Sequence, residues 1–182
     1  MTQMELQELE KQAKNGDPSA QFSFGLLLVL NNYYDEGKEF IVKSSEQENE
    51  EALRWISIHQ ELTKALEAVE VDDVVKGKKI DFWNLKKGYG TESFSFSPLS
   101  NEEIFIFCEN KNDNDNVFRH FHTEMINEKY FHILFDLWGL YINGKIKNKD
   151  IKPTKNAKYL ISILHYIIEN TPTLSSLFID ES

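Results

Sequence analysis

The stretch NGDPSAQFSFGLLLVL, residues 15–30, decides the fold of the N-terminal half of this chain. Gly16 suits the left-handed position that ends a preceding helix, which we expect over residues 2–15. Asp17 then caps a new helix, and Pro18 takes the first helical position, where its missing N–H costs nothing. Apolar side chains occupy much of the circumference that follows, so the stretch predicts a central helix over residues 18–30.

The sequence on the C-terminal side of this helix predicts a polar loop and then a third helix. The loop is expected at residues 33–46 and contains Gly37. The helix is expected at residues 48–70, because apolar residues recur on one of its faces. Four glutamates gather near its start, where the helix macrodipole favours carboxylates: Glu46, Glu48, Glu50 and Glu51.

The pattern changes after residue 75. Short strand-like runs at 80–85, 93–97 and 103–108 are separated by turn residues, which predicts an antiparallel three-stranded meander. Helices are expected again at 117–127, 129–142 and 154–169, with a last turn near 174–178. The sequence therefore predicts an α+β fold that is predominantly helical, with a helical region at 1–75 and a mixed region at 76–182 packed as one compact unit.

The N-terminal region resembles a Sel1-like repeat, a helix–turn–helix unit related to the tetratricopeptide repeat. The matching residues are Ala13, Gly16, Asp17, Ala20, Gln21 and Gly25, followed by the element Ala52-Leu53-Arg54-Trp55. The resemblance covers one copy at residues 13–58, with a longer loop than is usual in the family, and a degenerate second copy at 137–168. It implies paired antiparallel helices and a role in protein–protein binding, and it implies no catalytic residues.

Acidic residues are concentrated in the first half of the chain. The whole chain of 182 residues has a formal net charge of −10, and residues 1–76 alone carry 16 Asp and Glu against 7 Lys and Arg. This balance disfavours nucleic-acid binding by that half and suits a basic protein partner, which the long-range field would attract. The residues expected to contact that partner are Glu46, Glu48, Glu50, Glu51, Asp72 and Asp73. A bacterial immunity protein that inhibits a basic toxin is one concrete form of this function.

The cellular setting is predicted from what the chain contains and lacks. Residues 1–15 are charged, and the longest apolar run, residues 24–30, is too short to span a bilayer. The lone cysteine, Cys108, fits a reducing compartment. We therefore expect a cytoplasmic protein without a membrane partner, a nucleic-acid partner or a cofactor, and the sequence does not predict its oligomeric state.

The alternative function is that of an enzyme. His120, His122 and Glu124 form the best candidate cluster for metal binding or acid–base chemistry, and Cys108 is a candidate thiol nucleophile. On a helix, His120 and Glu124 would continue into a row with Glu128 and His132, whereas His122 would point away. On a strand, His120, His122 and Glu124 would share one face. The preferred prediction remains a binding protein with neither catalytic residues nor a metal site.

Overall fold

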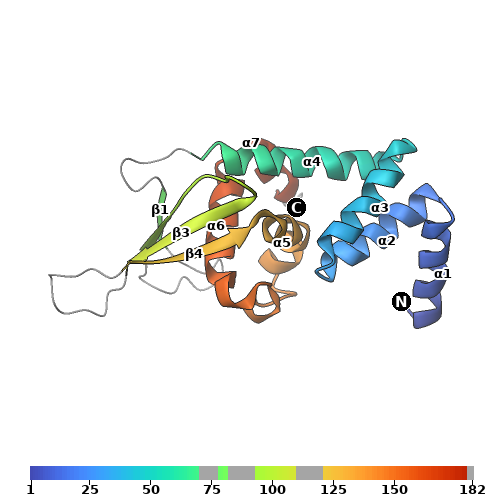
Figure 1. The fold of residues 1–182 in the computed structure, drawn as a ribbon, viewed down its shortest axis with the longest axis horizontal. Helices are drawn as coiled ribbons and strands as arrows, with labels where there is room; N and C mark the ends of the chain where they lie inside the picture. Colours follow the sequence, from blue (N-terminus) through green and yellow to red (C-terminus); the bar gives the residue numbers. More distant parts are fainter. Residues whose placement is uncertain (70–77, 82–92, 110–120, 180–182) are drawn as a thin grey trace. The chain divides into compact units, whose positions relative to one another are not determined.

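The computed structural model describes residues 1–69, 78–81, 93–109 and 121–179 (Figure 1). The fold is α+β and predominantly helical, as predicted. The chain divides into two compact units, Met1–Gln60 and Glu61–Ser182, and the division falls inside a helix. The boundary predicted at residues 75 and 76 lies outside the described residues.

The first unit contains α1 (Gln3–Lys14), α2 (Pro18–Leu30), α3 (Tyr34–Glu46) and the first part of α4 (Glu50–Glu67). Thr2 and Glu5 form a capping box at the start of α1, with Glu5 N donating to Thr2 Oγ1 at 3.1 Å. Asp17 caps α2 by accepting a hydrogen bond from Ala20 N at 2.7 Å. The helices predicted at 2–15, 18–30 and 48–70 are thus confirmed, with ends that shift by up to three residues.

The predicted polar loop at 33–46 is wrong, because α3 occupies it. Its buried residues, Gly37, Ile41 and Ser44, follow one another at spacings of four and three, which is the period of one helix face. Polar residues surround this narrow face, so the stretch looks like a loop when it is read without its packing partner. Burial of the face against α2 overrides its weak helical propensity.

Two glycines bring α2 and α3 into close contact, and the two helices lie side by side (Figure 1). A Cβ atom added to Gly25 would lie 2.6 Å from the carbonyl oxygen of Gly37, and one added to Gly37 would lie 2.8 Å from the backbone nitrogen of Val29. Gly37 is therefore a helix-packing residue rather than a loop residue.

The Sel1-like resemblance predicted that Ala52 and Trp55 lie on the helix that pairs with α2. The helix that follows α2 is α3, and Ala52 and Trp55 lie one helix later, on α4. The resemblance stays a prediction.

The second unit contains an antiparallel sheet with its strands in chain order: β1 (Lys78–Asp81), β2 (Ser93–Phe96), β3 (Glu103–Glu109) and β4 (Phe121–Asn127). The predicted meander is confirmed at β2, at β3 and at the first residues of its first strand, whereas residues 82–85 lie outside the described residues. The helix predicted at 117–127 is wrong where it is described, since β4 pairs with the whole of β3, from Glu103 opposite Asn127 to Glu109 opposite Phe121.

Helices of the second unit cover one face of this sheet. The helices of this unit are α5 (Glu128–Ile142), the short helices η2 (Asn148–Asp150) and η3 (Thr154–Asn156), α6 (Ala157–Glu169), α7 (Pro172–Ser175) and η4 (Ser176–Phe178). Of these, α6 contacts β1 and α5 contacts β4. The α6 helix is the most deeply buried of them, and its Tyr159 meets Phe94 of β2 edge to face, with ring centroids 5.1 Å apart. The helices predicted at 129–142, 154–169 and 174–178 are confirmed with small shifts.

One histidine of α6 predicts a pH-dependent contribution to stability. His165 stacks on Trp138 of α5, and its Nε2 lies 3.0 Å from Glu169 Oε1. Burial lowers the pKa of His165 below its ordinary value of 6.5, although the Glu169 carboxylate acts in the opposite direction. The unfolded chain therefore holds this proton more tightly, so the stability that His165 contributes is full above pH 6.5 and is lost as the pH falls through the folded-state pKa.

We expect His165→Gln to remove this loss. Urea unfolding of the wild type and of His165→Gln at about pH 7.5 and about pH 5.5 measures this effect. From the higher to the lower pH, the free energy of unfolding should fall more in the wild type than in the variant. Equal falls in the two proteins would contradict the assignment.

Candidate functional site

The acidic residues predicted to bind a partner lie where α3 ends and α4 begins. We call Glu46, Glu48, Glu50 and Glu51 the acidic corner. All four are exposed, and in the part of the chain that the structure describes none of them forms an ion pair. Residues 1–60, which include this corner, contain 11 Asp and Glu against 5 Lys and Arg, a formal charge of −6.

The backbone of the corner is fixed by contacts with the turn between α1 and α2. Gln47 Nε2 donates to the carbonyl oxygen of Gly16 at 3.0 Å and to Gln21 Oε1 at 2.8 Å. Ser44 Oγ donates to the carbonyl oxygen of Pro18 at 2.6 Å. Asn49 Oδ1 then caps α4 by accepting from Ala52 N at 3.0 Å. The four glutamates therefore project from a held backbone rather than from a loose loop.

The four glutamates differ in what they do for the fold. Glu50 and Glu51 lie in the first turn of α4, where the helix macrodipole stabilises carboxylates. Glu46 is the last residue of α3, where the same dipole disfavours a negative charge. Glu48 lies between the helices with a φ of 59°, a left-handed conformation that glutamate rarely adopts. Helix stability therefore explains two of the four carboxylates and leaves Glu46 and Glu48 without a structural role.

The predicted partner site has two further members, and the predicted enzyme cluster lies elsewhere in the chain. Asp72 and Asp73 lie outside the described residues.

Of the predicted enzyme cluster, Glu124 lies on β4 rather than on a helix, so the helical row that would join it to Glu128 and His132 is wrong at Glu124. His122 and Glu124 are two positions apart on this strand, which is the spacing of one strand face. Glu124 Oε1 forms an ion pair with Lys155 Nζ at 3.4 Å. His120 lies outside the described residues.

Cys108 and His122 are opposite each other as Cα partners in the ladder between β3 and β4. Their side chains are outside the described part of the structure, so a thiol–imidazole pair stays a prediction. Among the described residues, no group of three or more His, Cys, Asp or Glu side chains is placed to hold a metal ion.

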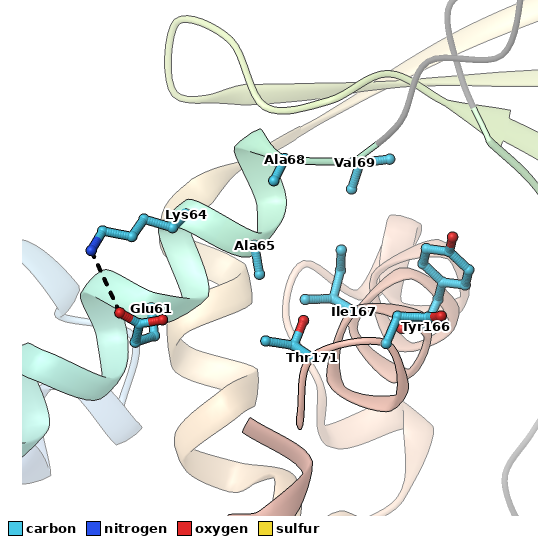
Figure 2. A pocket seen from close by; sticks show the side chains of 9 residues that line it. Glu61, Lys64, Ala65, Ala68, Val69, Tyr166, Ile167 and Thr171 are labelled. Atoms are coloured by element: carbon cyan, nitrogen blue, oxygen red, sulfur yellow. Dashed lines mark hydrogen bonds and ion pairs between the residues drawn. The ribbon is translucent and has the colours of Figure 1, made fainter. Parts of the chain in front are cut away.

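A pocket of about 500 Å³ lies between the C-terminal turns of α4 and α6 (Figure 2). Its floor is formed by small or aliphatic side chains and by the ring of Tyr166. Its rim is polar, and Figure 2 shows Lys64 extending toward Glu61, whose Oε1 lies 3.5 Å from its Nζ. The lining residues are Glu61, Lys64, Ala65, Ala68, Val69, Tyr166, Ile167, Asn170 and Thr171.

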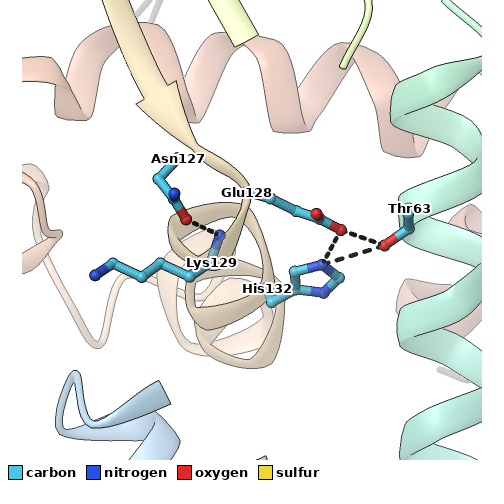
Figure 3. A network of polar contacts seen from close by, with 5 residues as sticks. All are labelled: Thr63, Asn127, Glu128, Lys129 and His132. Atoms are coloured by element: carbon cyan, nitrogen blue, oxygen red, sulfur yellow. Dashed lines mark hydrogen bonds and ion pairs between the residues drawn. The ribbon is translucent and has the colours of Figure 1, made fainter. Parts of the chain in front are cut away.

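A partly buried polar network connects α4 to α5 (Figure 3). Thr63 Oγ1 donates to Glu128 Oε1 at 2.5 Å, and His132 Nε2 lies 2.9 Å from the same oxygen. The carboxylate only accepts, so Nε2 carries the proton in this contact. The His132 side chain is 4% exposed and that of Glu128 is 20% exposed. The i, i+4 contact within the predicted row thus exists, and it holds two helices together.

No helix in the described part of the chain combines the length and the apolar character that a bilayer-spanning segment needs. No protein-family model, no curated protein and no solved structure matches this chain.

Proposed function

We propose that this protein is a protein–protein interaction module whose acidic corner holds a basic partner, in the manner of an inhibitor or immunity protein that neutralises a toxin. The observation that carries the proposal is the placement of Glu46 and Glu48. Both are exposed carboxylates at positions where the local fold gains nothing from them. Residues that depart from a local rule, as Glu46 does at a helix C-terminus and Glu48 does in backbone conformation, are expected to concentrate at functional sites.

The physical advantage of such a corner is fast and selective capture. Four like charges on a fixed backbone create a local negative potential, and the formal charge of −6 on residues 1–60 extends that potential. A basic protein is then steered toward the corner, and acidic competitors are repelled. The Sel1-like resemblance supports the same class of function by analogy.

The proposal is tested by capturing binding proteins from a lysate of the organism that makes this protein, with three forms of it used as baits. The baits are the wild type, the double variant E46K/E48K and the control E8K/E39K, with captured proteins identified by mass spectrometry. The control changes the net charge by the same amount, and Glu8 and Glu39 are exposed residues on α1 and α3. Lysine is favourable at position 46, in the last turn of α3, and position 48 lies between the helices, so we expect E46K/E48K to fold.

We expect one stoichiometric basic protein on the wild-type and control baits, and its loss from E46K/E48K. Equal recovery on all three baits would refute the role of the corner. Recovery of no basic protein by the wild type would refute the proposed partner class.

A further inference from the structure

The pocket between α4 and α6 is shaped for an aliphatic stem. Ala65, Val69 and Ile167 supply its apolar surface, and Val69 and Ile167 are buried at 9% and 3% exposure. Alanine at positions 65 and 68 leaves room that a larger side chain would fill. A volume of about 500 Å³ lies within the range of protein ligand sites and admits a long side chain with its adjoining backbone.

The charges of Glu61 and Lys64 in the described lining offset each other, and the uncharged polar groups of the rim favour a positive charge at the end of that stem. The last turns of α4 and α6 both line it, and the C-terminal end of a helix carries partial negative charge. Asn170 and Thr171 add side-chain oxygens that accept hydrogen bonds.

Among the described residues that line the pocket, Glu61 supplies the one carboxylate. Its Oε1 lies 3.5 Å from Lys64 Nζ, and the side chains of Glu61 and Lys64 are 44% and 71% exposed. An ion pair this exposed contributes little, so an incoming cation can replace Lys64 as the partner of Glu61.

We propose that this pocket receives the side chain of a lysine or arginine from a basic partner protein. The proposal rests on the proposed function for the source of that side chain, and it places a second contact in residues 61–182, outside the unit that carries the acidic corner. The aliphatic stem lies on Ala65 and Ile167, and the charged head reaches Glu61 and the oxygens of the rim.

Titration of the ¹⁵N-labelled full chain with two probes tests the chemistry. The first probe is N-acetyl-arginine methylamide, and the second is its citrulline counterpart, which has nearly the same shape without the charge. We expect saturable amide shifts for the arginine probe that centre on the pocket, and no comparable shifts for citrulline. Glu61→Gln should weaken binding of the arginine probe and Lys64→Gln should strengthen it, each by about two- to fivefold, as exposed charges allow.

Ala68→Leu tests whether the arginine probe binds inside the pocket. Ala68 is exposed, so leucine there fills the pocket without displacing core residues, and the arginine probe should no longer shift the remaining pocket amides. Equal binding of citrulline, shifts elsewhere on the protein, or changes of the same sign in Glu61→Gln and Lys64→Gln would overturn the proposal.

Whether the cation comes from the partner protein is tested by adding Ala68→Leu as a fourth bait in the capture experiment. Weaker recovery of the basic protein supports a side chain in the pocket. If Ala68→Leu no longer binds the arginine probe but still recovers the basic protein as well as the wild type does, the pocket does not receive a side chain of that protein. Because the probes need no partner, their failure leaves the result for E46K/E48K intact, so the two proposals fail separately.

Discussion

Gly37→Ala is expected to destabilise the first unit by about 1–3 kcal/mol or more, the usual cost of overpacking. The added methyl group would lie 2.8 Å from the backbone nitrogen of Val29, and it would also press on the carbonyl oxygen of Gly25. Backbone atoms of a packed helix cannot rotate away as a side chain does, so α2 and α3 must separate. Alanine gains up to about 1 kcal/mol of helix propensity over glycine, which offsets only part of this cost.

Gly139→Ala is the matched control, because Gly139 is also helical, and a methyl group added there would meet nothing within 4 Å beyond its own helix and chain neighbours. This change should stabilise the protein by up to about 1 kcal/mol. Urea unfolding followed by circular dichroism measures both variants. A stabilising effect of Gly37→Ala would contradict the close contact between α2 and α3.

His132→Ala is expected to cost about 2–4 kcal/mol, since it empties a buried site and removes one of the donors to Glu128. His132 is 3% exposed, so water does not readily replace the lost imidazole. The measurement is the free energy of unfolding in urea at about pH 7.5. A loss below about 0.5 kcal/mol would show that the network does not hold α4 to α5.

Thr63→Val provides the finer test of the same network. Valine keeps the shape of threonine but removes the hydroxyl that donates to Glu128 Oε1 at 2.5 Å, and we expect a loss of about 1–2 kcal/mol. Thr63 and His132 both donate to Glu128 Oε1. The loss of unfolding free energy in the double variant Thr63→Val/His132→Ala should therefore differ from the sum of the two single losses by about 0.5 kcal/mol or more. Additive effects would argue that Thr63 and His132 act independently.

Local signals were sufficient for the elements whose ends are set by caps. Asp17 and Pro18 predict the start of α2, and the hydrogen bond that Asp17 accepts from Ala20 N confirms the cap. The fold class and most helices of the second unit follow from apolar periodicity in the same way. These features depend on residues within a few positions of one another, so the sequence alone carries them.

Features that depend on distant partners were missed. The α3 helix is stabilised by its contact through Gly25 and Gly37, and β4 by pairing along β3. Neither partner is visible from local composition, so polar residues around Gly37 indicated a loop, and apolar spacing near Met125 indicated a helix. Both errors have the same cause, because tertiary pairing outweighs local propensity.

The candidate sites also divide into what nearby residues predict and what depends on residues distant in the sequence. The acidic corner is visible as a run of glutamates, but only the positions of the helix ends separate Glu46 and Glu48 from the two glutamates that stabilise α4. The pocket was not predicted, since its two walls come from α4 and α6 and meet only in the folded unit. The signal in the sequence is the pair of alanines at positions 65 and 68, three residues apart at the end of α4, and without the position of α6 it does not indicate a pocket.

The association rate of the captured basic protein, measured at two ionic strengths, tests the central claim most directly. We expect the wild type to associate fast and to slow steeply with added salt, because the acidic corner steers the partner. E46K/E48K should associate about tenfold more slowly with little dependence on salt, whereas E8K/E39K should remain close to the wild type. Equal rates and equal salt dependence for the two double variants would contradict a partner site at the corner.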